Sequence, residues 1–550
     1  MSRVRIPLAA PFLCFVLPSG HNSCFFGALP ETMKFSCVLS CILFVFVLHS
    51  STPCQKSIKK FVDDEILVKF KAGVQPESIR RLSNTFGANN LETFGDLGWQ
   101  RLKLPKGFSV AKAIEKFRVD DSVLDAQPNF YYSLQAVPND PIYTNPGMYG
   151  MAKISAPQAW DISTGSSTVV VADIDTGIRY THEDLAPNMW VNPGETPGND
   201  IDDDGNGFVD DVYGYDFRFN DPDPLDQHGH GTHTAGTIGA AGNNNLGVVG
   251  VNWNVKLMAI KIYSGPANDT TSAMLINAYN YVRMMKNRGV NIRVTNNSYG
   301  GCPETCGYDQ ATKDAIDALG DLDILNAFAA GNSGTDNDVT PFYPSSYTSP
   351  SIISVAASRP DDTRQFSYGL TSVDLAAPGV SIWSTYFGAD SGSAAYTVMS
   401  GTSMATPHVA GAAALLSSVN PSLSAASLKA TLMNTVDQLP QWNGVVRSGG
   451  RLNVFAALQN QTVCTFNLSS QSMLVPTKGG QFTVDVTAPQ NCDYSVKSNA
   501  NWIIVNGPPV QSANGQAKFW VRVNSTVRRT GTIKIGGQTV TVTQSRDGIL

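Results

Sequence analysis

The stretch TVVVADIDTG, at residues 168–177, decides the fold class of this 550-residue chain. Its apolar residues follow one another without the alternation of a half-exposed strand, and Thr176 and Gly177 end the run. Similar runs alternate with amphipathic segments such as residues 271–289; they are VKLMAIKIYSG, VNIRVTNNSYG, LDILNAFAAGN and IISVAAS. Strands buried on both faces have this pattern, so residues from about 155 to 458 predict an α/β layer fold with a mostly parallel sheet.

The chain is too long for a single core, and its patterns divide it into four parts. Residues 57–135 alternate short strands with two helices, which predicts a small α+β module. Residues 136–460 carry the α/β pattern. Residues 461–550 change to a period of two in QFTVDVTA, AKFWVRVNS and GTIKIGGQTVTVTQS, which predicts an all-β sandwich of immunoglobulin-like kind. Residues 1–56 form a leader.

The leader has the pattern of a secretory signal. Met33 and Lys34 precede an apolar run at residues 35–48 and then a small polar stretch, whereas residues 1–32 have no such pattern. We therefore place the true start at Met33. The run is shorter than the roughly 20 residues that a bilayer-spanning helix needs, so we expect a secreted protein with no membrane span in its mature form. A short membrane anchor is the alternative.

Charge and cysteine content narrow the possible partners. A net charge of -6 argues against nucleic acid, because such a surface would release few counterions from a polyanion. Outside the leader the cysteines number four, and an even number in an exported chain favours disulfides. The simplest pairing joins Cys302 to Cys306 and Cys464 to Cys492. Metal binding is the alternative, but no histidine lies near either pair.

Three reactive residue types stand where strands end or helices begin. Asp175 ends the run at 168–177, His230 lies between glycines in HGHGTHTAG, and Ser403 lies in GTSMATPHVAG, where an apolar helix begins. A serine hydroxyl becomes a good nucleophile when an imidazole takes its proton and a carboxylate orients that imidazole. The chain order Asp, His, Ser is one of the known orders of such triads.

The chain resembles the subtilisin-like serine peptidases, the subtilases, over roughly residues 140–458. The segments DTG at Asp175, HGTH at His230 and GTSMATPHVAG around Ser403 match three signatures of the family. The resemblance implies that Asp175 orients the imidazole, His230 acts as general base and acid, and Ser403 attacks the peptide carbonyl. It also implies that Asn332, in NAFAAGNSG, stabilises the oxyanion together with the backbone N–H of Ser403.

Neighbouring histidines compete for the role of base. The register of HGTH selects His230 over His228, and His233 and His408 are interpreted as structural. The resemblance further implies that an edge segment pairs with an extended substrate and borders the pocket for the residue before the cut. That segment is Ser298, Tyr299, Gly300 and Gly301, and the small loop CPETC that follows it departs from the simplest family members.

An acidic stretch between residues 199 and 227 holds ten aspartates. Packed carboxylates repel one another unless a cation neutralises them, and the spacing fits a calcium loop. The expected ligands are Asp200, Asp202, Asp204, the backbone carbonyl of Asn206, and Asp211, with Asp210 as a substitute. A solvated acidic loop is the alternative. Subtilases commonly bind structural calcium, so the resemblance agrees, and no catalytic metal is expected.

The flanking modules complete the hypothesis. Residues 57–135 lie where subtilases carry an inhibitory propeptide, which implies autocatalytic removal between about residues 134 and 149; a permanently attached domain is the alternative. Residues 464–545 begin with Cys464 and contain NCDYSV, NANWIIV and RRTGTIKIGGQTVTVTQ. They resemble the BACON family of immunoglobulin-like domains, which implies a carbohydrate or glycoprotein ligand. Trp502 or Trp520 could stack on a sugar ring, although a lone tryptophan in a sandwich more often belongs to the core.

These observations predict a secreted, calcium-stabilised serine endopeptidase that is monomeric, acts on proteins or peptides, and is made as a zymogen inhibited by its own propeptide. A subtilase specialised for one leader peptide, or one that transfers the acyl group to an amine, is an alternative within enzymes. The alternative outside enzymes is a binding protein whose peptidase domain is inert.

Overall fold

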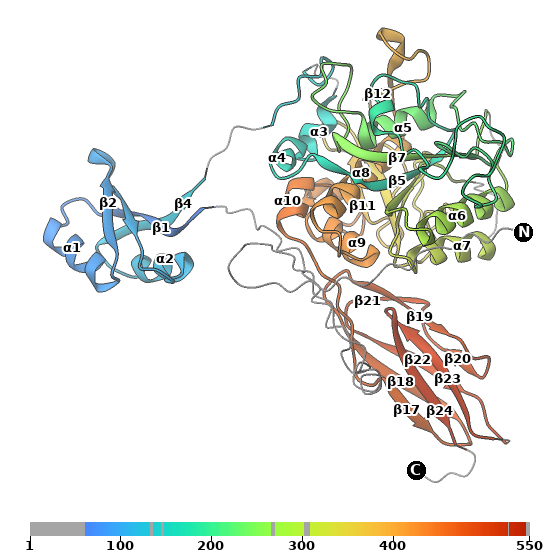
Figure 1. Cartoon of the computed structure of the whole chain (residues 1–550). Helices are drawn as coiled ribbons and strands as arrows, with labels where there is room; N and C mark the ends of the chain where they lie inside the picture. The colour runs from blue at the N-terminus through green and yellow to red at the C-terminus, as the bar shows by residue number, and fades with distance from the viewer. Residues whose placement is uncertain are drawn as a thin grey trace, which may run out of the picture. The chain divides into compact units, whose positions relative to one another are not determined.

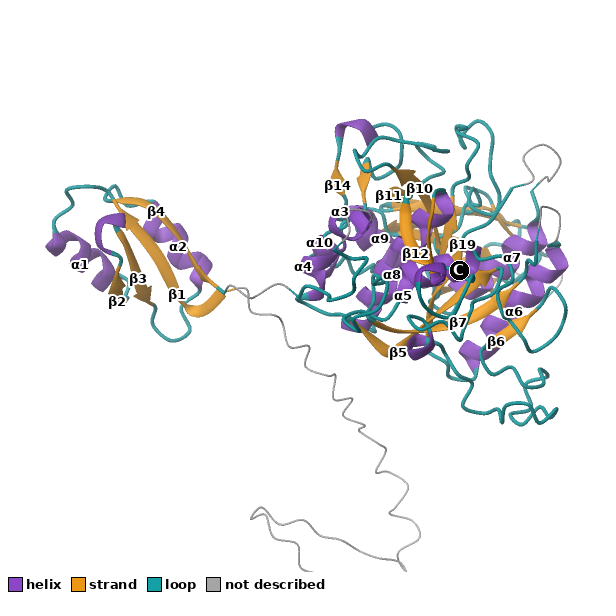
Figure 2. Ribbon diagram, turned by 90° about the horizontal axis from the view of Figure 1, so that it is seen from above, coloured by secondary structure: helices purple, strands orange, loops and turns teal. Residues whose placement is uncertain are grey.

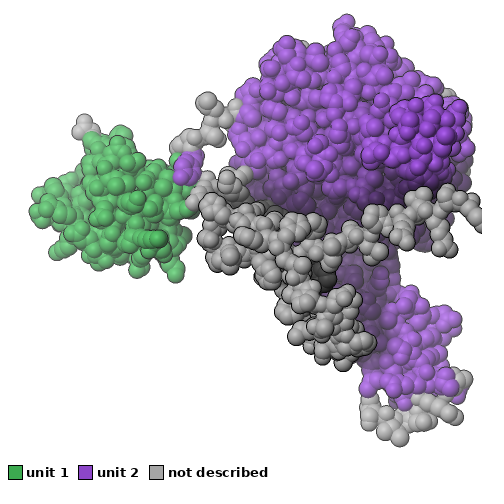
Figure 3. All heavy atoms as spheres, in the orientation of Figure 1, with its two compact units in different colours: residues 1–130 green, residues 131–550 purple. Residues whose placement is uncertain are grey.

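The computed structural model describes residues 61–131, 136–144, 148–265, 270–301, 308–525 and 527–545. The chain divides into two compact units, residues 1–130 and residues 131–550, drawn in green and purple in Figure 3. The signal-like leader with Met33, and the pair Cys302 and Cys306, lie outside the described residues. Every helix within the described ranges is too short or too polar to cross a bilayer.

The first unit is a four-stranded antiparallel sheet covered by two helices (Figure 1). Ala113 and Phe117 of the second helix pack with Ile66 and Val68 of the first strand to form its core. The strand order is β2-β3-β1-β4, and this arrangement confirms the predicted small α+β module. The elements are β1 (Phe61–Phe70), α1 (Pro76–Thr85), β2 (Asn89–Thr93), β3 (Trp99–Lys103), α2 (Val110–Arg118) and β4 (Val123–Phe130).

The second unit is built on a nine-stranded sheet of order β14-β15-β11-β10-β9-β8-β5-β7-β6. Neighbouring strands pair in parallel except β14 with β15. The strands are β5 (Gly165–Asp175), β6 (Gly214–Asp216), β7 (Asn254–Lys261), β8 (Ile292–Asn297), β9 (Leu325–Ala329), β10 (Ile352–Ser358), β11 (Leu375–Pro378), β14 (Asp437–Gln438) and β15 (Gly450–Arg451).

Helices cover both faces of this sheet, which is why its strands are apolar throughout. Val169 and Val171 of β5 belong to the core that α5 and α8 complete, whereas Val170 and Ile174 belong to a second core with Tyr281 of α6. The resulting three-layer α/β fold, seen with helices in purple and strands in orange in Figure 2, confirms the predicted fold class. The helices are α3 (Tyr149–Lys153), α4 (Ala156–Trp160), α5 (His230–Gly239), α6 (Ser272–Asn287), α7 (Gln310–Gly320), α8 (Thr402–Val419), α9 (Ala425–Asn434) and α10 (Val454–Gln459).

The C-terminal part is the predicted all-β sandwich. Its two sheets have the orders β16-β18-β22-β20 and β17-β24-β23-β19-β21, and a disulfide joins Cys464 to Cys492. Trp502 packs against the sandwich core, whereas Trp520 on β22 is 46% exposed. The strands are β16 (Asn467–Leu468), β17 (Ser472–Val475), β18 (Gly480–Thr487), β19 (Asp493–Ser498), β20 (Ile503–Val505), β21 (Val510–Ser512), β22 (Gly515–Val521), β23 (Arg529–Ile535) and β24 (Gln538–Gln544).

Candidate active site

Asp175 and His230 meet where a strand ends and a helix begins. Asp175 is the last residue of β5 and His230 is the first residue of α5. Nδ1 of His230 lies 2.7 Å from Oδ1 of Asp175, and the same oxygen accepts a hydrogen bond of 2.7 Å from the N–H of Thr176. The carboxylate therefore fixes the tautomer with the proton on Nδ1 and leaves Nε2 available to accept a proton.

The electrostatics around His230 favour a stronger base. Burial alone would lower the pKa of the imidazole, but the negative charge of Asp175 and the hydrogen bond to Asp175 more than offset that effect, so the pKa is raised. A general base is most effective when its pKa lies near the working pH. The arrangement thus suits a proton acceptor that works at a pH above the ordinary pKa of histidine.

Asp226 holds the first turn of α5 in place, and sequence reasoning missed it. Its carboxylate accepts hydrogen bonds from the N–H of Gly229 at 2.9 Å and of Thr232 at 2.9 Å. The hydroxyl of Thr176 donates to Asp226 at 2.9 Å and accepts from the N–H of Gly231 at 2.8 Å. The end of β5 and the start of α5 are thereby tied together, which sets the distance between the carboxylate and the imidazole. The signal in the sequence is an acidic residue just before a helix start.

Ser403 lies in the first turn of α8 and is tied to the segment that follows β8. Its hydroxyl donates to the carbonyl of Ser298 at 2.9 Å, and the hydroxyl of Ser298 donates to the carbonyl of Ser403 at 2.9 Å. In the described part of the chain, no hydrogen bond joins Ser403 to His230. Catalytic hydrogen bonds are often unformed until substrate binds, so this geometry is compatible with a nucleophile.

Asn332 and the N–H of Ser403 face one small space. Oδ1 of Asn332 accepts from the backbone N–H of Thr402 and from its hydroxyl, both at 2.9 Å, which directs Nδ2 the other way. A Cβ placed on Gly401 would lie 3.3 Å from Nδ2 of Asn332 and 3.6 Å from the N of Ser403. Two donors that converge at a helix N-terminus can stabilise an oxyanion there.

The other histidines have environments that separate them from His230. His233 and His408 are buried, and their ring nitrogens are paired with the carbonyls of Ile382 and Met404. Burial lowers the pKa of His233 to about 3 and that of His408 to about 4. His228 is exposed, with its ring centroid 6.4 Å from that of His230. Of His228, His230, His233 and His408, only His230 contacts the carboxylate of Asp175.

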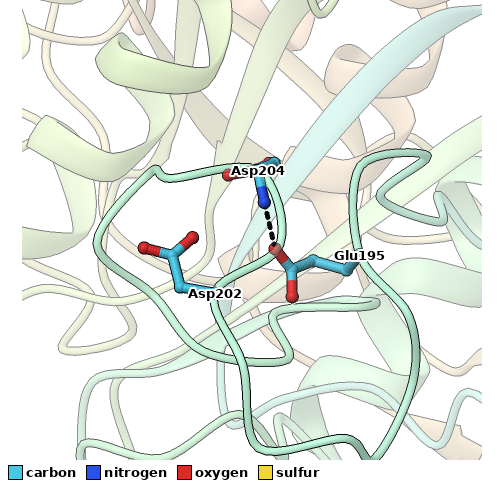
Figure 4. A group of neighbouring side chains, drawn as sticks. All are labelled: Glu195, Asp202 and Asp204. Carbon is cyan, nitrogen blue, oxygen red and sulfur yellow. Dashed lines mark hydrogen bonds between the residues drawn. The ribbon is translucent and has the colours of Figure 1, made fainter. Parts of the chain in front are cut away.

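The acidic stretch folds into a loop whose carboxylates partly converge. Ligand oxygens of Glu195, Asp202 and Asp204 lie within 4.8 Å of one another (Figure 4). Glu195 accepts from the N–H of Asp204 at 3.2 Å, and Asp202 accepts from the N–H of Asn206 at 2.9 Å. Three carboxylates this close are a suitable set for a hard divalent cation, and the residues present fit calcium.

The remaining expected ligands have other surroundings. Asp200 is exposed and lies outside this group, and its N–H donates to Asp210 at 2.9 Å. Asp211 is buried, where its oxygens accept from Asn192 at 2.8 Å and from Asn206 at 2.9 Å, and burial raises its pKa to about 6. Glu195 was missed because it precedes the loop and follows no ligand spacing.

Comparisons with known proteins define the class. The pattern of the subtilase family, peptidase S8, matches residues 166–453, and the pattern of the fervidolysin N-terminal prodomain matches residues 51–129. Thermitase of Thermoactinomyces vulgaris is 35% identical over 323 residues, which cover 58% of this chain and 99% of thermitase. The thermophilic serine proteinase of Bacillus sp. (strain AK1) is 31% identical over 403 residues, covering 72% of this chain and 88% of that protein.

The crystal structure of fervidolysin from Fervidobacterium pennivorans, a keratinolytic enzyme related to subtilisin, covers 88% of this chain and 91% of its own, with 19% identity and a TM-score of 0.47. This chain belongs to the subtilase family. It is a subtilisin-like serine endopeptidase preceded by a prodomain.

Proposed function

We propose that this subtilase cleaves peptide bonds with Ser403 as nucleophile, His230 as general base and acid, and Asp175 as the residue that orients the imidazole. Asn332 and the N–H of Ser403 stabilise the oxyanion of the tetrahedral intermediate. The observation that carries the proposal is the 2.7 Å contact between His230 and Asp175, because it leaves Nε2 as the proton acceptor.

The decisive experiment compares the full chain with its Ser403→Ala variant. We expect the wild type to hydrolyse casein and the variant to be inactive, while the circular dichroism of the variant shows a folded chain with a cooperative thermal transition. Hydrolysis that persists in Ser403→Ala, in protein free of other proteases, would overturn the assignment of the nucleophile.

We also propose that the chain is a zymogen that removes residues before Ala136 by its own activity. The segment from Ala136 onward is held by the catalytic domain. The N–H of Ala136 donates to Asp161 at 2.7 Å, and the buried carboxylate of Asp140 accepts from the N–H of Asn243 at 2.8 Å. Residues fixed in this way are expected to stay with the mature enzyme.

N-terminal sequencing of the mature protein tests this boundary. We expect a first residue at or just before Ala136 in the wild type and an uncut chain for Ser403→Ala. A mature terminus well after Asp140 would contradict the proposal, because it would remove contacts that the catalytic domain buries.

We propose that Glu195, Asp202 and Asp204 hold a structural Ca²⁺, which would relieve the repulsion between their carboxylates. We place the enzyme outside the cell, because residues 33–48 resemble a secretory signal and the Cys464–Cys492 disulfide persists in oxidising surroundings. No step of the proposed reaction passes through the metal.

A further inference from the structure

Two glycine-lined segments converge on the proposed nucleophile and leave a slot between them. Ser298, bonded to the hydroxyl of Ser403, begins the segment that runs to Gly301. The other segment ends in Gly331, directly before Asn332. A peptide whose carbonyl carbon lies at Ser403 and whose oxygen lies at Asn332 has the side chain of that same residue beside this slot.

The ring of Phe342 occupies the slot. A Cβ placed on Gly300 would lie 2.5 Å from Cε1 of Phe342, and one on Gly301 would lie 2.6 Å from Cε2. A Cβ on Gly331, on the opposite wall, would lie 3.0 Å from Cδ2 of the same ring. Both walls therefore touch the ring at van der Waals distance, and they can do so only because they carry no side chains.

Hydrogen bonds hold the backbone of Phe342 in place beside one wall of the slot. Its N–H donates to the hydroxyl of Ser346 at 2.9 Å, and its carbonyl accepts from the N–H of Ser346 at 2.9 Å. The next carbonyl, that of Tyr343, accepts from the N–H of Gly301 at 3.0 Å. These bonds tie the segment that carries the ring to one wall of the slot.

We infer that Phe342 determines substrate specificity by filling the pocket for the residue that supplies the scissile carbonyl, so the enzyme cleaves after residues with small side chains such as Gly, Ala and Ser. A large side chain would have to displace the ring from its contacts with both walls, which costs binding energy in the transition state. This inference rests on the proposed catalytic role of Ser403.

The test uses two fluorogenic peptides that differ only in the residue before the scissile bond, Ala or Phe. For the full chain after maturation, we expect kcat/KM to be about 100-fold higher for the Ala peptide. Phe342→Ala should raise kcat/KM for the Phe peptide by about 10- to 100-fold, and it should thereby lower the ratio of kcat/KM between the Ala and the Phe peptide. Tyr308→Ala, a matched loss of an exposed ring near Tyr343, should leave the ratio unchanged.

Two results would overturn the inference. One is a wild-type enzyme that cleaves after Phe as fast as after Ala. This result can be obtained even if the Phe342→Ala variant does not fold. The other is a Phe342→Ala variant that remains active with the wild-type ratio.

A binding measurement separates this inference from the proposed mechanism. Equilibrium binding of the same two peptides to Ser403→Ala, after an added protease has removed its propeptide, should favour the Ala peptide, and the additional Phe342→Ala change should remove that preference. If no hydrolysis is detected but this binding preference is present, the mechanism fails and the specificity assignment stands. If hydrolysis depends on Ser403 while both binding and turnover ignore Phe342, the specificity assignment alone fails.

Discussion

Thr402 donates both its backbone N–H and its hydroxyl to Oδ1 of Asn332, each at 2.9 Å. The same hydroxyl accepts a bond of 3.1 Å from the N–H of Gly331. A residue adjacent to Ser403 in the chain thus orients the side-chain amide that faces the proposed oxyanion. Thr402 is fully buried, so it acts through Asn332 and is a positioning residue.

Replacing this hydroxyl should weaken catalysis without weakening substrate binding. We expect Thr402→Val to lower kcat about 10-fold with little change in KM, because Asn332 loses one of two bonds that fix its orientation. Asn332→Leu should lower kcat about 100- to 1,000-fold, since it removes the donor itself. Steady-state kinetics on one peptide measure both effects, and Thr402→Ser should restore the wild-type rate. A Thr402→Val variant with normal kcat would remove Thr402 from this role.

The raised pKa of His230 predicts the pH dependence of activity. The general base must be neutral, so kcat/KM should rise with pH through a pKa above the ordinary value for histidine, about 6.5. Asp175→Asn should lower kcat by about 10⁴-fold, because the imidazole loses the group that fixes its tautomer. The pKa of this rise is measured from a pH–rate profile of kcat/KM on a neutral peptide. If kcat/KM of the wild type rises with a pKa well below 6.5, the raised pKa that we assign to His230 is contradicted.

Asp173, two residues before Asp175, should be protonated in the folded enzyme. Its two oxygens lie 2.8 Å from Nδ2 of Asn296 and 2.9 Å from the hydroxyl of Thr234. That hydroxyl also lies 2.9 Å from the carbonyl of Gly231, and it has one proton for two acceptors. Burial, and then the charge of Asp175, raise the pKa of Asp173 well above its ordinary value.

This protonation predicts the sign of a stability change. The folded state holds a proton that the unfolded state releases near pH 4, so the wild type loses stability as pH rises toward neutrality. Asp173→Asn mimics the protonated acid at every pH. Compared with the wild type, the variant should therefore have a higher free energy of unfolding at pH 7, and this gain should be smaller at pH 4. Asp173→Ala should lower it by about 1–3 kcal/mol by leaving Asn296 and Thr234 without a partner. Thermal unfolding of the wild type and both variants at pH 4 and pH 7 tests this prediction. If Asp173→Asn is less stable than the wild type at pH 7, the carboxylate of Asp173 is ionised in the folded enzyme.

Calcium removal should destabilise the enzyme through the loop that holds Glu195. With calcium at about 100 times its Kd, binding contributes about 2.7 kcal/mol, which chelation would remove. Glu195→Gln should reduce the calcium-dependent rise in unfolding temperature, whereas Asp200→Asn should preserve it, because Asp200 lies outside the converging group. The reverse result would favour the ligand set that the spacing of the loop predicts.

Asp493, at the start of β19, binds two cations of the catalytic domain. It lies 3.1 Å from Nζ of Lys429 and 2.8 Å from Nη2 of Arg447. Burial opposes its ionisation, but Lys429 and Arg447 hold the pKa of Asp493 well below its usual range. The contribution to stability is therefore present above the ordinary aspartate pKa, about 3.9, and is lost as pH falls below it.

Removing this carboxylate should destabilise the protein at neutral pH. Asp493→Ala leaves Lys429 buried beside Asp374 alone, and we expect a loss of about 3 kcal/mol. Lys497→Ala, which removes an exposed pair with Asp321, is the control and should cost at most about 1 kcal/mol. Denaturant titration at pH 7 compares the two, and equal losses would show that the buried network contributes no more than a surface pair.

The sequence predicted the features that depend on neighbouring residues, namely the strands, the helices and the motifs. The structure adds the contacts between segments that are distant in the chain. Continuous apolar runs such as residues 168–177 predicted a buried parallel sheet because strand patterning needs no tertiary knowledge. The motifs around Asp175, His230 and Ser403 were located by their positions at strand and helix ends. Glu195 could not be found by loop spacing, since it reaches the acidic group from a preceding segment.

Phe342 was missed for the same reason. It is ten residues beyond Asn332 in the chain, and nothing in its local sequence indicates that its ring lies between Gly300 and Gly331. Only the convergence of two segments at Ser403 gives that ring a role. Similarly, sequence left Trp502 and Trp520 equivalent, whereas the fold packs one against the core and exposes the other.

The Cys464–Cys492 disulfide encloses β16, β17 and β18, the first three strands of the sandwich. An endopeptidase that accumulates around copies of itself is exposed to its own activity, and the stretch between the two cysteines includes exposed residues such as Ser469 and Gln471. A single cut anywhere between the two cysteines leaves both fragments covalently joined. In an oxidising environment such a cut therefore leaves the C-terminal domain attached, whereas in an unlinked chain it would sever the domain, and a reductant would be needed to separate the fragments.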